Sequence, residues 1–78
     1  MKTMTCEELG GACGLEFRAE TFEKIADLSM KHGIEMFKKG DKPHLESMEE
    51  MKALRESGDM GEWFEKKRDA FDDLPEDD

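Results

Sequence analysis

Three residues near the start of the chain carry side chains suited to metal binding or thiol chemistry: Cys6, Cys13 and His32. Thiolate sulfur and imidazole nitrogen are common zinc ligands in proteins. Six residues separate the two cysteines, whereas zinc knuckles and ribbons usually hold paired cysteines about two to four residues apart. A metal site here therefore requires a hairpin that brings the two thiols together, with His32 added from a packed helix.

A structural zinc site takes four ligands, and the fourth is open between His44, Glu35 and water. The same residues also have simpler interpretations. Cys6 and Cys13 can be small buried hydrophobic residues, His32 a polar residue at the edge of the core, and His44 a solvent-exposed residue at a helix start. A reversible Cys6–Cys13 disulfide is a further hypothesis, because a hairpin can meet the required Cα separation of roughly 4.4–6.8 Å.

Seven methionines are many for this length, and five of them fall on predicted helices: Met30, Met36, Met48, Met51 and Met60. Thioethers can join thiolates in binding copper(I), but methionine also fills irregular cores and adaptable partner grooves. The chain has no tyrosine, no phosphate-binding glycine loop and no nucleophile elbow. We therefore predict that the protein is not an enzyme.

The hairpin that positions the cysteines is predicted over residues 1–20. Its first strand covers residues 2–6, with Met4 and Cys6 on one face. A turn follows at residues 9–12, because paired glycines accept backbone angles that other residues resist.

The second strand is predicted over residues 15–19, where apolar and polar side chains alternate. This alternation directs Leu15, Phe17 and Ala19 towards the core. Extended backwards, it places Cys13 on the same face, so both thiols are expected to point inwards.

The first helix is predicted over residues 21–40, with Thr21 as N-cap and Gly40 at its end. His32 borders the buried side of this helix. The predicted buried stripe comprises Phe22, Ile25, Ala26, Ser29, Gly33, Met36 and Phe37, flanked by Leu28 and His32.

The second helix is predicted over residues 41–57, capped by Asp41. The third spans residues 59–74, where Asp59 and Glu62 resemble a capping box. A frayed acidic tail covers residues 75–78. The predicted stripe of the second helix is Leu45, Met48, Met51, Lys52 and Arg55 with Leu54 at its side, and that of the third is Met60, Trp63, Phe64, Lys67, Ala70, Phe71 and Leu74.

These elements predict a single α+β domain over residues 1–78, a two-stranded antiparallel β-hairpin followed by three α-helices (ββααα). Its 78 residues lie near the lower limit for a self-sufficient core. Such small chains often use a metal, a disulfide or a second subunit.

The net charge is −9, and most of it lies in residues 41–78. Such a surface repels phosphate backbones and anionic lipids, so we expect neither nucleic-acid nor membrane binding. No signal peptide or transmembrane run is evident, so a cytoplasmic location is predicted. Cysteines there are usually reduced or bound to metal.

The segments Met4-Thr5-Cys6, Leu9-Gly10-Gly11-Ala12-Cys13, Glu16-Phe17, Thr21-Phe22-Glu23 and Lys31-His32-Gly33 resemble a family of short bacterial and archaeal proteins. That family is a domain of unknown function, described as predicted small metal-binding proteins. The resemblance covers about residues 1–37 and implies Cys6, Cys13 and His32 as ligands. Members often carry a second histidine one turn after the first, where this chain has Met36.

The main hypothesis is a small metal-binding protein, with Zn²⁺ held by Cys6, Cys13 and His32. The alternatives are a metal-free interaction module or homodimer that uses the methionine and aromatic faces of the second and third helices, and a thiol-redox protein with a reversible Cys6–Cys13 disulfide.

Overall fold

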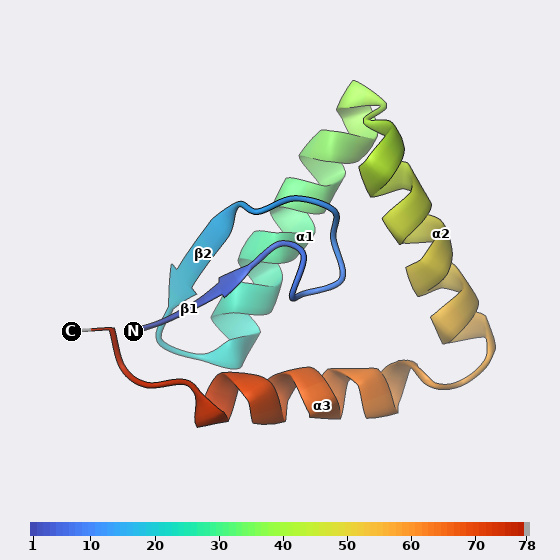
Figure 1. Cartoon of the computed structure of the whole chain (residues 1–78). Coiled ribbons are helices and arrows are strands. Elements are labelled where there is room, and N and C mark those ends of the chain that lie inside the picture. Colours follow the sequence, from blue (N-terminus) through green and yellow to red (C-terminus); the bar gives the residue numbers. More distant parts are fainter. Residues whose placement is uncertain (78) are drawn as a thin grey trace.

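The computed structural model describes residues 1–77 and has the predicted ββααα order. Figure 1 shows the strands β1 (Lys2–Thr5) and β2 (Glu16–Ala19) and the helices α1 (Phe22–Lys39), α2 (Lys42–Glu56) and α3 (Met60–Asp73). The strands pair antiparallel. The predicted α+β fold class is therefore confirmed.

The hairpin buries one face against α1. Met4 lies opposite Phe17 across the ladder, and both are buried together with Ala19. Leu15 does not join them, since 49% of it is exposed. The strand begins only at Glu16, so the predicted alternation does not extend back to Leu15.

The chain between the strands is not pleated. The consecutive amides of Cys6 and Glu7 donate to the carbonyls of Leu15 and Cys13, at 2.8 and 2.9 Å. In a regular strand, consecutive amides point to opposite sides. The backbone therefore turns at Cys6, and the inward direction of Cys13 does not come from strand alternation.

The loop starts with a single helical turn, and the hydrogen bonds between Thr5 and Glu8 in this turn resemble a capping box. The Glu8 carboxylate accepts from the Thr5 amide at 2.9 Å and from its hydroxyl at 3.0 Å, while the Glu8 amide donates to the Thr5 hydroxyl at 3.1 Å. The Leu9 amide donates to the Thr5 carbonyl, and Gly10 then reverses the chain with φ 92°. The predicted glycine turn is thus preceded by an ordered helical turn.

Both predicted ends of α1 are confirmed. The Thr21 hydroxyl accepts from the Lys24 amide at 3.2 Å, and Gly40 has the left-handed φ of 69° that favours glycine. Phe22, Ile25 and His32 are the buried residues of this helix. Phe37 was predicted to be buried but is 63% exposed, because it lies on the flank of Met30 and Ile34, which no described element covers.

The two remaining helices are each held at one buried residue, His44 in α2 and Phe71 in α3. Asp41 caps α2 as predicted, accepting from the His44 amide at 3.2 Å. The predicted capping box of α3 is wrong, because Asp59 makes no side-chain cap bond and accepts instead from the Ser57 hydroxyl.

Two predicted stripe positions of α2, Lys52 and Arg55, are exposed, and so are Phe64 and Ala70 of α3. Few elements lie against these two helices, so their periodic faces are only partly covered. Their apolar patterns predicted the helices correctly but overestimated burial.

The acidic tail was predicted to be frayed, which is wrong for Glu76 and Asp77. Glu76 pairs with the Met1 ammonium at 2.6 Å. The Asp77 carboxylate accepts from the Thr3 hydroxyl at 2.6 Å, and its amide donates to the Met1 carbonyl at 2.8 Å. Asp78, the last residue of the predicted tail, lies outside the described residues.

The molecule is flat: its three helices form the sides of a triangle, and the hairpin lies across α1 (Figure 1). Its principal extents are 35 × 28 × 15 Å. No helix within residues 1–77 has the length and apolar character needed to cross a bilayer. The core cluster joins the hairpin and its loop to α1 and the end of α3: Met4, Cys6, Leu9, Phe17, Ala19, Phe22, Ile25 and Phe71.

Candidate metal centre

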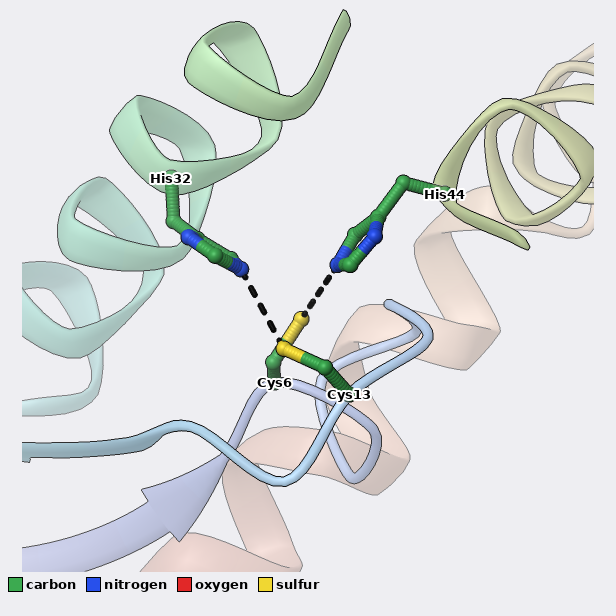
Figure 2. A group of neighbouring side chains, drawn as sticks. All are labelled: Cys6, Cys13, His32 and His44. Carbon is green, nitrogen blue, oxygen red and sulfur yellow. Dashed lines mark hydrogen bonds between the residues drawn. The ribbon is translucent and has the colours of Figure 1, made fainter. Parts of the chain in front are cut away.

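Four side chains of metal-ligand type converge beside the hairpin loop: Cys6, Cys13, His32 and His44. One sulfur or nitrogen from each residue lies within 4.8 Å of all the others. Figure 2 shows the two sulfurs side by side below the two imidazole rings, which approach from α1 and α2. The cluster thus joins the hairpin loop, α1 and α2.

The sulfur–nitrogen distances fit a tetrahedral centre. Cys13 Sγ lies 3.3 Å from His32 Nε2, and Cys6 Sγ lies 3.6 Å from His44 Nε2. Zinc bonds of about 2.3 Å to sulfur and about 2.0–2.1 Å to nitrogen give a tetrahedral S···N edge of about 3.6 Å. These two distances and the ligand types are therefore compatible with a bound metal ion.

Gly11 makes room for the Cys6 sulfur. A Cβ at Gly11 would lie 2.1 Å from Cys6 Sγ and 3.0 Å from the Cys6 carbonyl oxygen. The Gly11 amide also donates to that oxygen at 2.8 Å. Any side chain at this position would displace the sulfur or the loop, so glycine is required by close approach.

The two thiols lie in different environments. Burial raises the pKa of Cys6, which is only 2% exposed. The Leu15 amide, two residues after Cys13, donates towards the Cys13 sulfur and lowers its pKa, with smaller contributions from Cys6 and His44. Cys13 is therefore the thiol that ionises more readily, and metal binding needs the thiolate.

Asp41 fixes the orientation of His44. Its carboxylate oxygen lies 2.5 Å from His44 Nδ1 and also accepts from the His44 amide. The same hydrogen bond lowers the pKa of Asp41 and raises that of His44. Because the Nδ1 proton is held by Asp41, neutral His44 presents the lone pair of Nε2 to the sulfurs, as in many carboxylate–histidine–zinc arrangements.

His32 is held by ring packing. It is 9% exposed, and its ring makes edge contacts with Phe17, at a centroid distance of 5.7 Å, and with His44, at 5.2 Å. It lies on α1 two turns after Ile25, which is fully buried. The hairpin core therefore sets the position of this imidazole.

The cluster is not sealed from solvent. A cavity of about 200 Å³ reaches Cys6 and His44 from between the loop, α1 and α2. Met48, Met51 and Arg55 also line it. This cavity provides an entry path for a small ion.

The structure brings together Cys6, Cys13 and His32 as the sequence predicted, and it adds His44. Glu35, the other protein residue named for the fourth position, is exposed and is not part of the cluster. The expectation that His44 is exposed is wrong, since it is only 5% exposed. The second imidazole thus comes from α2 rather than from the position of Met36.

Sequence analysis missed two supporting residues. Asp41 was identified only as a helix cap, although an aspartate three residues before a histidine at a helix start can bond both its amide and its ring. Gly11 was identified only as a turn residue. Its contact with Cys6 depends on the helical turn of the loop, which the sequence pattern did not reveal.

Comparisons of the sequence and fold with models of known families, with curated proteins and with solved structures find no match in any of the three.

Proposed function

We propose that this protein binds one zinc ion through Cys6, Cys13, His32 and His44. The observation that carries the proposal is the geometry of the cluster, whose S···N distances of 3.3 and 3.6 Å match the edges of a zinc tetrahedron. The orientation of His44 by Asp41 supports it. So does the resemblance of residues 1–37 to a family of predicted small metal-binding proteins, to which we assign the chain as part of this proposal.

The four protein ligands favour a structural or ion-holding role over a catalytic one. Catalytic zinc sites usually keep a coordination position for water or substrate, whereas structural sites are closed by four protein ligands. Here the four ligand residues tie the loop, α1 and α2 together in a chain with a small core. Bound zinc would supply folding free energy at this junction.

The test is metal content combined with spectroscopy. We expect the protein, purified without chelator or a histidine tag, to contain one zinc per chain by elemental analysis. Replacement by cobalt(II) should give thiolate charge-transfer bands and the visible absorption of a tetrahedral ion.

His44→Ala and Glu35→Ala form a matched pair for this test. The first should lose stoichiometric binding, whereas the second should keep it, because Glu35 lies outside the cluster. A folded wild-type protein that takes up neither zinc nor cobalt would contradict the proposal.

A second candidate, a thiol-redox function, is favoured by the different environments of the two cysteines. Oxidation of the two thiols by glutathione disulfide would form the Cys6–Cys13 bond and release two glutathione thiols. Cys13, with its lowered pKa, would attack, and Cys6 would complete the bond. Titration of the zinc-free protein in glutathione buffers should then show the disulfide at cellular potentials, whereas a pair that stays reduced there leaves only the metal function.

A further inference from the structure

One flank of α1 carries large apolar side chains that nothing in the described chain covers. Met30 is 65% exposed, Ile34 50% and Phe37 63%. Their spacing of four and three residues places them on the same side of the helix. This flank is separate from the one formed by Phe22, Ile25 and His32, which faces the hairpin and the metal cluster.

The apolar flank continues onto α2. One hollow is lined by Met30, Ile34, Phe37 and Met48, and an adjoining hollow is lined by Phe37, Met48 and Leu45. We call these five residues the open face. Soluble monomers seldom leave a large contiguous apolar patch uncovered, and such patches commonly mark protein interfaces.

The molecule also exposes more surface than its mass predicts. Its accessible surface is 5467 Å². A folded monomer of 9.0 kDa is expected to expose about 4,900 Å². The excess is about 600 Å² over the whole molecule. The flat shape, with a smallest extent of 15 Å, accounts for this excess.

The charges around the open face suit a second copy of the same chain. Lys38 and Lys42 lie at its end near the α1–α2 junction, while Glu46 and Glu49 lie further along α2. A two-fold axis through the face exchanges its two ends. The basic end of one copy then meets the acidic end of the other, so the pattern complements itself.

We infer that the open face, with Phe37 and Met48 at its centre, is the interface of a two-fold symmetric homodimer. This surface includes α1, unlike the surface on the second and third helices expected from the sequence. None of the four cluster residues belongs to the open face, although Leu45 and Met48 lie on α2, which His44 joins to the cluster. Zinc bound to a monomer, or a dimer that holds no zinc, separates this inference from the zinc proposal.

The first experiment measures the mass of the full chain, with and without added zinc, by sedimentation and light scattering from about 1 μM to about 1 mM. We expect a reversible dimer. Phe37→Glu should weaken the affinity of the dimer about a hundredfold or more, because the interface would then bury a carboxylate without a partner. Circular dichroism and zinc content should not change, since Phe37 is exposed in the single chain.

Leu28→Glu is the matched control, because Leu28 is on the same helix, is 38% exposed and lies outside the open face. It should leave the dimer unchanged. A wild-type chain that stays monomeric over the whole range would overturn the inference. A dimer that survives Phe37→Glu, or that Leu28→Glu weakens equally, would do so too.

The second experiment tests the two-fold arrangement by exchanging charges. Lys38→Glu and Glu49→Lys should each weaken the dimer about five- to tenfold. The double variant restores opposite charges across the axis and should recover most of the affinity. Two single losses that simply add in the double variant would overturn the predicted pairing of these ends.

Discussion

The two halves of the chain are held together by different means. Of the ten buried residues within residues 1–77, eight belong to residues 1–40, and the other two are His44 and Phe71. The first half has a small core of its own. Each later helix is fastened at one buried residue, α2 by a candidate metal ligand and α3 by a phenylalanine in the core cluster.

This difference shows where metal binding should matter most. Burial of Phe71 is hydrophobic and does not depend on any ion. His44 reaches a cluster of thiols and imidazoles, so the position of α2 should follow the occupancy of that cluster. Metal removal tests the contrast between α2 and α3 directly, and three smaller effects concern the loop, the cap of α2 and the tail.

Metal removal should produce the largest effect. Free zinc about a thousandfold above its dissociation constant should raise the free energy of unfolding by about 4 kcal/mol relative to the metal-free protein. Hydrogen exchange should show that the amides of α2 lose more protection than those of α3 without metal. Phe71→Leu is the counterpart. This substitution should lower the free energy of unfolding by about 1–2 kcal/mol through looser packing of α3, and the zinc content should be unchanged. Equal protection of α2 with and without metal would refute this contrast.

Gly11→Ala should displace the Cys6 sulfur and disturb the cluster at the loop. Overpacking of this kind costs about 1–3 kcal/mol, and the affinity for zinc should fall with it. Thermal unfolding and competition with a chromophoric chelator measure the two effects. Gly14→Ala is the control, because a Cβ there meets nothing within 4 Å and the residue has no positive φ. Comparable losses in both variants would mean that space beside Cys6 is not the cause.

Asp41→Ala should lower zinc affinity about tenfold to a hundredfold, because His44 loses the carboxylate that orients its ring. It should also cost about 1 kcal/mol through loss of the α2 cap. Thr21→Ala removes the equivalent cap from α1 and serves as the control for that cost. If both variants bind zinc like the wild type, Asp41 acts only as a cap.

Acid should release the tail only at low pH, because the pKa of Asp77 is lowered, and this is the smallest effect. The hydrogen bond from Thr3, followed by contacts with Arg18, lowers the pKa of Asp77 below its usual value. Stabilisation by a group of this kind is complete above the unfolded pKa of about 3.9 and is lost as the pH falls through the folded pKa. Carboxyl NMR shifts should report this release below about pH 4. Asp77→Asn should remove the part of the acid-induced change that comes from release of the tail, and an Asp77 that titrates at its ordinary pKa would contradict the prediction.

The sequence predicted the fold well because its local signals agree with one another. Thr21 and Gly40 mark the ends of α1, and Asp41 marks the start of α2. The hydrophobic periodicity of the sequence predicted the three helices. It did not give the extent of burial, because a pattern such as that around Phe37 does not show whether another element covers it.

The candidate site was predicted in part. Cys6, Cys13 and His32 follow from residue type and from one hairpin packed on one helix. His44 depends on the path of the chain through Gly40 and Asp41, which sets how α2 returns towards the loop. The angle between α1 and α2 is a tertiary property, so the sequence could offer His44 only as one of several candidates for the fourth ligand.

The contacts of Glu76 and Asp77 with Met1 and Thr3 have a practical consequence for protein engineering. Residues 1 and 77 lie close enough for a few glycines to join them. A circular permutant opened at Gly58, where φ is 85° and a Cβ would meet nothing within 4 Å, would put α3 ahead of the hairpin. The four cluster residues would keep their order on the loop, α1 and α2, and both new chain ends would lie outside residues 6–44, which would give a scaffold for redesigning the site.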